Sequence, residues 1–339
     1  MSVSPTVQAK RVGREFKQYL PWRVQRALSP SFYVEFATKA LFRKVLSTRP
    51  LQTGDGTVEV LSLLDRRNLE NYLIAIKSLL LHSPVPLAVT VLSDGTLGNQ
   101  DRELLLEHIR GIRVLEKKDI NIPSAYAEAI AAWCKGYPHL AKLMYLPFAS
   151  RKPLLLFIDS DITFRCPLCP SFFSLPAGVA ATFNCDHDHR LYDPKFHYVE
   201  RYASERDINL ISNLNCGLML WDAARLSPLE CLGFLQYLLE LDGYLHPVAE
   251  QDAWSLLASQ VRALPLPDEY LVLSNWDKND AEHRRSAITM HYVSGERYRR
   301  LDYLRDGSRT IRLLHRAPAT DGFRGVPDGE GQQQANRAT

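Results

Sequence analysis

The stretch from Leu154 to Phe164 reads LLLFIDSDITF, in which five apolar residues lead into two carboxylates, Asp159 and Asp161. An apolar run of this length is typical of a buried strand in a parallel sheet. The carboxylates then follow the carboxyl end of the strand, the edge where open α/β sheets bind ligands. Because side chains alternate along an extended chain, Asp159 and Asp161 are expected to point the same way. Two converging carboxylates favour a hard cation, Mn2+ or Mg2+, which usually also holds phosphate oxygens.

The chain before this stretch alternates predicted strands and helices. This order is typical of a doubly wound sheet, so we expect an α/β fold with a mainly parallel central sheet and flanking helices. The carboxylates then lie on about the fourth strand. The predicted strands are 57–64, 87–92 and 112–116, and the predicted helices are 68–82, 100–109 and 139–148.

After Phe164 the pattern is looser. The Asp-, His- and Tyr-rich segment 185–202 predicts a long active-site loop that faces an acceptor. From Arg316 the chain is polar and rich in Gly and Gln, which predicts a disordered tail. Further strands are expected at 179–183, 214–221, 261–264 and 287–293, and helices at 229–241 and 251–257.

The composition is that of a globular protein, with 46% hydrophobic residues, 23% charged residues and a net charge of +3. No apolar run is long enough to predict a transmembrane helix. The N-terminus lacks the pattern of a secretory signal, and the six cysteines do not suggest a disulfide framework. We therefore expect a reducing, cytoplasmic setting.

The basic residues are concentrated at the N-terminus. Residues 1–52 contain ten Lys or Arg and two Glu, a net charge of +8 that leaves −5 for the rest of the chain. This segment is either an amphipathic stretch on the inner face of an anionic membrane or a pair of helices packed on the domain with a solvated basic face. The irregular hydrophobic spacing favours the packed helices. No motif that would indicate nucleic-acid binding accompanies the charge.

A cysteine pair raises the question of a zinc site. Cys166 and Cys169 have the Cys-x-x-Cys spacing of zinc ligands, and Cys185, His187 and His189 follow them. The spacing of this second group is irregular. Buried, unreactive thiols are therefore the favoured interpretation.

The segment 159–163 also matches Asp-x-Asp-x-Thr, the first motif of the haloacid-dehalogenase-like phosphatases. In that class the first Asp is a nucleophile, the second is an acid or base, and Mg2+ is the cofactor. That class, however, has its motif on the first strand and needs a later acidic motif, and neither feature is found in this sequence. The phosphatase hypothesis therefore rests on one short match.

Five segments agree instead with another class of enzyme. They are HLAKLMYL at 139–146, LFIDSD at 156–161, NCGLML at 215–220, EQD at 250–252 and HYV at 291–293. In this order and spacing, the region from about 57 to 307 resembles bacterial glycosyltransferases of the family 8 type and their GT-A relatives, which use nucleotide-diphospho-sugars. Each match is weak alone, and the five together are fairly specific.

The resemblance implies a GT-A fold and a hexosyltransferase whose donor is a nucleotide-sugar, most simply a UDP-sugar. It implies that Asp159, Asp161 and His291 hold Mn2+ or Mg2+, which offsets charge on the leaving diphosphate. An imidazole ligand favours Mn2+. The acceptor is left open by the sequence: a glycan, a lipid-linked sugar or a small molecule.

The resemblance also implies roles for residues around the donor. Gln251 would lie at the anomeric carbon, where the family retains stereochemistry, and Glu250 would bind sugar hydroxyls. Asn215 would lie beside the donor sugar. Further donor contacts would come from Asp65 and Asp94 to the base and ribose, from Lys142 and Arg297 to phosphate or sugar, and from Ser160, Gly217 and Asp252.

The match has departures. Glu250 replaces the usual Asp, and Gly295 is displaced by one position from the usual place after His291. A non-catalytic module that binds nucleotide-sugars on a degenerate GT-A scaffold is therefore a third hypothesis. The domain organisation we expect is a basic helical extension at 1–52, a GT-A domain at 53–315 and a disordered tail at 316–339.

Overall fold

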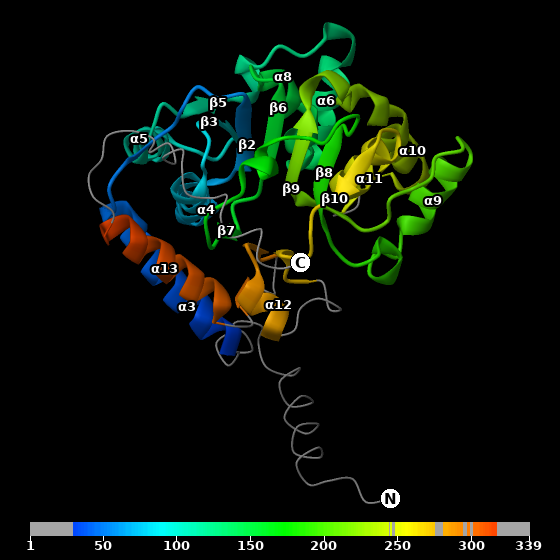
Figure 1. Ribbon diagram of the computed structural model, residues 1–339. Coiled ribbons are helices and arrows are strands. Elements are labelled where there is room, and N and C mark those ends of the chain that lie inside the picture. The colour runs from blue at the N-terminus through cyan, green and yellow to red at the C-terminus, as the bar shows by residue number, and fades with distance from the viewer. Residues whose placement is uncertain are drawn as a thin grey trace, which may run out of the picture.

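A seven-stranded sheet forms the centre of the protein in the computed structural model, which describes residues 30–243, 245, 248–274, 281–293, 297–298 and 301–316 (Figure 1). The strand order is β10-β8-β9-β6-β2-β3-β5, and β9 alone runs antiparallel to its neighbours. This confirms the mainly parallel sheet expected from the sequence. The strands are β1 Leu51–Gln52, β2 Val58–Leu64, β3 Leu87–Ser93, β4 Ile109–Arg110, β5 Arg113–Leu115, β6 Leu154–Ile158, β7 Ile162–Phe164, β8 Ala181–Cys185, β9 Leu214–Asp222, β10 Ala263–Pro265, β11 Tyr270–Val272 and β12 Thr289–His291.

Helices cover both faces of this sheet, as a doubly wound fold requires. In β6, Leu156 and Ile158 belong to one hydrophobic core, whereas Leu155 and Phe157 belong to the other. Helices α3, α4, α5 and α13 line the first core, and α6 to α11 line the second. The helices are α3 Pro30–Phe42, α4 Leu69–His82, α5 Asn99–His108, α6 Ser124–Gly136, α7 Leu140–Met144, α8 Leu146–Ala149, α9 Phe196–Ser204, α10 Leu232–Asp242, α11 Ala249–Ser259, α12 Ala281–Ser286 and α13 Asp302–Arg316.

The strand order reverses direction between β2 and β6. From β2 the chain moves outward through β3 to β5 and then returns to form β6 on the other side of β2. In open α/β sheets a ligand binds at such a switch point, outside the carboxyl ends of the strands. Asp65 and Asp159 are the residues that follow the two strands at this point.

A second, three-stranded sheet lies beside the switch point. Its order is β11-β12-β7, with β12 antiparallel to β7 and His291 paired with Ile162. Strand β7 starts directly after Asp161, so this pairing brings the late histidine to the carboxylate pair across a large separation in the sequence.

Several elements of the structure differ from our expectation. The segment 185–202 is not one long loop, because β8 extends to Cys185 and α9 begins at Phe196. Phe196, Val199 and Ala203 are buried on one side of α9, a helical spacing that the polar composition of the segment concealed. Helices α6 and α13 were also missed.

Part of the basic N-terminal segment packs on the domain. Helix α3 lies beside α13 (Figure 1), and Phe42 contacts Tyr303 edge to face. Gly307 makes this approach possible, since a Cβ atom there would lie 2.1 Å from the Phe42 ring. Residues 1–29 and the predicted tail from 317 lie outside the described residues. No described helix is long and apolar enough to span a membrane.

Candidate active site

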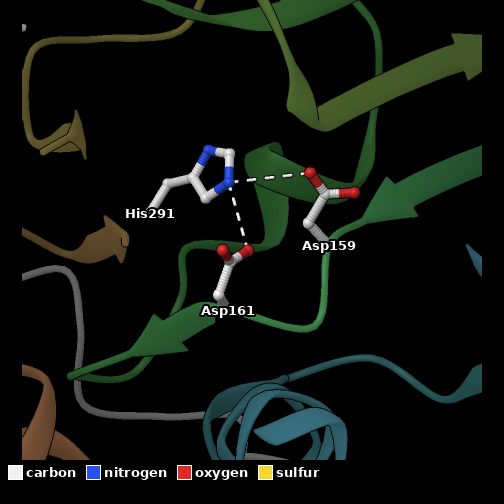
Figure 2. Close-up of side chains that lie close together, drawn as sticks. All are labelled: Asp159, Asp161 and His291. Atoms are coloured by element: carbon white, nitrogen blue, oxygen red, sulfur yellow. Dashed lines mark ion pairs between the residues drawn. The ribbon is translucent and has the colours of Figure 1, made fainter. Parts of the chain in front are cut away.

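Asp159, Asp161 and His291 converge at the switch point (Figure 2). The Nε2 atom of His291 is 3.2 Å from Asp161 Oδ1 and 3.6 Å from Asp159 Oδ2. The convergence predicted from the sequence is present, but its cause differs. The chain turns at Ser160 and Asp161 and is not extended there, so it is the turn that aims both carboxylates at the imidazole.

Asn215 fixes the orientation of the His291 ring. Its Oδ1 atom accepts from the backbone N–H of Gly217 at 2.9 Å and lies 2.8 Å from Nδ1 of His291. An amide oxygen only accepts, so Nδ1 carries the proton and the lone pair of Nε2 points at the carboxylates when the ring is neutral. Gly217 leaves space for this ring, because a Cβ atom at position 217 would lie 2.1 Å from His291.

Two cations neutralise the carboxylates. Lys142 Nζ donates to Asp159 Oδ1 at 2.7 Å, and Arg297 donates to Asp161. Burial would lower the pKa of Lys142, but the Asp159 and Glu250 carboxylates hold it above its usual value. Burial likewise acts to raise the pKa of Asp161, yet the Arg297 and His291 charges keep it below its usual range. The site therefore holds fixed negative and positive charges in direct contact.

These groups line one cavity of about 330 Å³, which we call the central pocket. Its volume is within the range of small-molecule sites. Nine residues predicted from the sequence line it, and they come from the ends of β2, β3 and β6, from α7 and α11, and from the β12 region. They are Asp65, Asp94, Lys142, Asp159, Ser160, Asp161, Glu250, His291 and Arg297.

The acidic residues Asp65, Asp94 and Glu250 differ in the hydrogen bonds that their carboxylate oxygens already accept. Asp65 accepts from the backbone N–H groups of Arg67 and Asn68, and Asp94 accepts from Thr96 in a turn. Both therefore serve local turns as well as lining the pocket. Glu250 is buried, and burial raises its pKa while Lys142 offsets only part of that effect.

Four other predicted residues do not line the central pocket. Asn215 and Gly217 hold His291, as described above. Gln251 and Asp252 face a second polar cluster instead, which the sequence analysis did not predict. Asp252 is fully buried, and its Oδ1 atom is 3.3 Å from Nδ1 of His189.

His189 connects this cluster to Gln251. Its Nε2 atom is 2.9 Å from the Leu214 carbonyl oxygen and 3.0 Å from the Gln251 amide nitrogen. The same amide nitrogen donates to the Tyr192 hydroxyl at 2.8 Å. His189 and Tyr192 belong to the segment predicted as a loop, and only the fold brings them to Gln251.

Cys166 and Cys169 are not part of a candidate metal site among the described residues. Among the described residues, Asp159, Asp161 and His291 form the one group of three or more His, Cys, Asp or Glu residues whose ligand atoms meet closely enough for an ion. Cys166 is half-buried and Cys169 is exposed. The favoured interpretation of buried thiols is therefore wrong for Cys169.

Solved structures match the chain, whereas comparisons with protein-family models and with curated proteins give no match. The bifunctional glycosyltransferase WbbM in its apo form matches with a TM-score of 0.51 and 14% identity, over 77% of this chain and 52% of WbbM. At this identity the likeness concerns the fold. The chain has a GT-A type fold.

Two further glycosyltransferase structures match with lower TM-scores. Galactosyltransferase LgtC, in complex with donor and acceptor sugar analogs, has a TM-score of 0.48 and 12% identity, over 77% of this chain and 98% of its own. Mouse xyloside xylosyltransferase 1 in its apo form has a TM-score of 0.43 and 15% identity, over 71% of this chain and 98% of its own.

Proposed function

We propose that the protein is a metal-dependent glycosyltransferase of the family 8 type, which moves a sugar from a UDP-linked donor to an acceptor with retention of configuration. One observation carries the proposal: Asp159, Asp161 and His291 meet at the switch point of a GT-A type sheet, in a pocket that also presents Lys142 and Arg297. Two fixed cations beside a divalent-ion site suit a ligand with several negative oxygens, such as a diphosphate.

The donor set fits a divalent ion. Neighbouring ligands of an octahedral ion lie about 3 Å apart, close to the 3.2 and 3.6 Å separations of His291 Nε2 from the two carboxylates. The mixture of carboxylate and imidazole favours Mn2+ over Mg2+. When bound, the ion would act as a Lewis acid that stabilises charge on the leaving nucleoside diphosphate.

The protein's own residues would then bind and orient the donor. Arg297 offers a planar fork of N–H donors for phosphate oxygens, and Lys142 offers a buried charge whose position Asp159 fixes at 2.7 Å. Asn68, whose Oδ1 accepts from Arg297 at 3.2 Å, holds the guanidinium toward the pocket. These charges are prearranged, so they stabilise developing negative charge with little reorganisation.

The donor sugar would lie toward Glu250 and Gln251 at the start of α11. Glu250 accepts from Trp254 Nε1 at 3.1 Å, which leaves its second oxygen for a sugar hydroxyl. Gln251 would lie near the anomeric carbon, with His189 and Tyr192 holding its amide. Asn215, Gly217 and Asp252 would act through His291 and His189, behind the donor.

The acceptor in this proposal is a glycan, a lipid-linked sugar or a small molecule. We further propose a cytoplasmic enzyme that works at the inner face of a membrane, with a basic extension at 1–52, a GT-A domain at 53–315 and a disordered tail at 316–339. The concentration of basic residues before residue 52 supports the membrane contact.

A nucleotide-binding screen tests the proposal. Thermal shifts should be measured with UDP, GDP, ADP and CDP, each with Mn2+ and with EDTA, and hydrolysis of the matching nucleotide-sugar should follow. We expect UDP to stabilise the protein only when Mn2+ is present. Asp161→Asn should remove both the stabilisation and at least about 100-fold of the rate.

Asp222→Asn is the matched control, because Asp222 ends β9, caps the following turn and pairs with Arg225, and does not line the central pocket. Full donor hydrolysis in EDTA would contradict the metal site. Release of phosphate from simple phosphomonoesters with Mg2+, lost in Asp159→Asn, would favour a phosphatase. UDP binding that ignores the metal, without turnover, would favour a binding module.

A further inference from the structure

Helices α3 and α13 form an outer layer on one side of the molecule. They contact each other, and both contact α4 on their inner sides (Figure 1). Their outward sides therefore belong to one surface, on the side of these two helices that faces away from α4. None of the residues on this surface lines the central pocket.

Basic side chains run along the outside of α13. Arg305, Arg309, Arg312 and Arg316 are all exposed and follow one another at intervals of four, three and four residues, which places them on one side of a helix. The apolar residues of α13 face inward, where Tyr303, Ile311 and Leu314 are buried. The helix is therefore strongly amphipathic. Its polar side is mainly basic, and the half-buried Asp302 on that side lies 3.7 Å from Arg305.

Helix α3 and the turn after it add aromatic rings and more positive charge. Phe36 is 70% exposed and Tyr33 is 63% exposed, and they are the two most exposed aromatic side chains among the described residues. Lys39, Arg43 and Lys44 are exposed beside them. The exposed residues Tyr33, Phe36, Lys39, Arg43, Lys44, Arg305, Arg309, Arg312 and Arg316 are called the α3–α13 face below.

The charge on this face has one sign. Seven of its residues are Lys or Arg, and no Asp or Glu among the described residues of the two helices is in the exposed class. Glu35 and Asp302 are half-buried and pair with Lys39 at 2.7 Å and with Arg305 at 3.7 Å, and Asp306 is buried and accepts a hydrogen bond from Tyr292. Exposed aromatic rings among mainly basic side chains suit a surface that is apolar beneath an anionic layer.

We propose, building on the membrane contact of the proposed function, that the α3–α13 face docks on an anionic lipid bilayer, with the arginines on the headgroups and Phe36 and Tyr33 inserted at the acyl boundary. Charge complementarity supports this partner, because each Lys or Arg near an anionic membrane adds to binding. Five of the seven here, all except Lys39 and Arg305, have no ion pair among the described residues. The two aromatic side chains supply the apolar contact that a purely electrostatic surface lacks. The face leaves the central pocket free for a donor.

Vesicle co-sedimentation of the full-length protein tests this inference. The lipids should be phosphatidylcholine alone and phosphatidylcholine with phosphatidylglycerol, at low and at physiological salt. We expect binding to the anionic vesicles only, and weaker binding at higher salt. The double variant R309E/R312E should lower the partition coefficient by about 10-fold or more, and Phe36→Ser should lower it several-fold while the salt dependence stays.

Matched controls separate this face from charge in general. The double variant R201E/R225E reverses two exposed arginines on other parts of the molecule and should bind as the wild type does. Thermal melting of every variant checks the fold. Equal binding by R309E/R312E and the wild type would overturn the proposal and assign binding to the basic residues before α3.

Two other outcomes would also overturn it. Binding that does not distinguish anionic from neutral vesicles would exclude the electrostatic contact. If no vesicles are bound and sedimentation shows a dimer that Phe36→Ser dissociates, the face covers a second copy of the chain.

Discussion

Lys142 and Lys77 are both buried lysines, with 3% and 0% of their surface exposed, but they differ in their partners. Lys142 lies in the central pocket, 2.7 Å from an Asp159 oxygen and 3.9 Å from a Glu250 oxygen. These carboxylates raise its pKa above the usual value, in spite of burial. Lys142 is therefore a permanent positive charge held in the central pocket.

Lys77 has neutral partners. Its ammonium donates to Thr48 Oγ1 and to the Arg49 carbonyl, both at 2.8 Å, and lies 3.0 Å from Nδ1 of His108. No ion pair joins it to a carboxylate among the described residues. Burial lowers its pKa to about 7, and the Arg49 charge acts in the same direction. Burial alone therefore does not set the charge of a lysine, because the charged groups beside it decide the direction of its pKa shift.

The largest effect that this comparison predicts is on catalysis. Lys142→Met would leave Asp159 and Glu250 without their shared cation and remove a positive group from the place where negative charge develops. We expect a fall in donor hydrolysis of about 100- to 1000-fold, measured as initial rates at saturating Mn2+. Lys77→Met is the matched control, because it removes an equally buried lysine, and it should change the rate by less than about twofold. Similar losses in both variants would show that the rates report stability and not the site.

A second variant tests whether His291 needs the space beside Gly217 to bind the metal. Gly217→Ala would place a Cβ atom 2.1 Å from the His291 ring, so the imidazole must move away from the carboxylates. We expect the affinity for Mn2+ to fall by about 10- to 100-fold, as when a ligand loses its supporting contact, measured by calorimetry. Gly136→Ala is the control, because a Cβ atom there meets nothing within 4 Å. Unchanged Mn2+ binding in Gly217→Ala would argue against His291 as a ligand.

A smaller effect is expected from the cluster behind the pocket. His189→Leu would leave the Gln251 amide nitrogen with the Tyr192 hydroxyl and would leave Asp252 buried beside an apolar group. We expect kcat to fall by about tenfold, with little change in KM for the donor, since a displaced side chain affects the reacting centre more than binding. Tyr192→Phe should cost less. A rise in the KM for the donor with an unchanged kcat would instead indicate that His189 supports donor binding.

The part of the central pocket at the strand ends could be predicted from the sequence, because Asp65, Asp94 and Asp159 follow apolar strands. The lining residues from α7, α11 and the β12 region were indicated only by the resemblance to a known family. The length of the run before Asp159 indicates a strand, and the order of elements before it indicates a parallel sheet. These two facts place Asp65 and Asp159 at the same edge. The approach of His291 could not be derived in this way, and only the resemblance to a known family indicated it.

The parts that were missed share a physical cause. Helix α13 buries Asp306, Gly307 and Thr310, so its inner side does not read as an apolar stripe. The Asp306 carboxylate accepts hydrogen bonds from Tyr292 and Thr163, and the ring of Phe42 packs closely on Gly307. All three partners lie outside α13. His189 is similar, since its contact with Asp252 depends on the packing of the segment before α9 against α11.

The pH dependence of stability provides the last test of the two lysines. A lysine whose pKa is about 7 in the folded state and about 10.4 when unfolded binds fewer protons in the folded protein between these values. The free energy of unfolding must then rise with pH across that window. Between pH 7 and pH 9, we expect the rise in wild type to exceed that in Lys77→Met by about 1–2 kcal/mol, measured by urea unfolding. Lys142→Met should match the wild-type pH response, because Lys142 stays charged in both states over this range. If Lys77→Met also matches it, Lys77 is charged in the folded protein, and the two lysines then differ in location but not in charge.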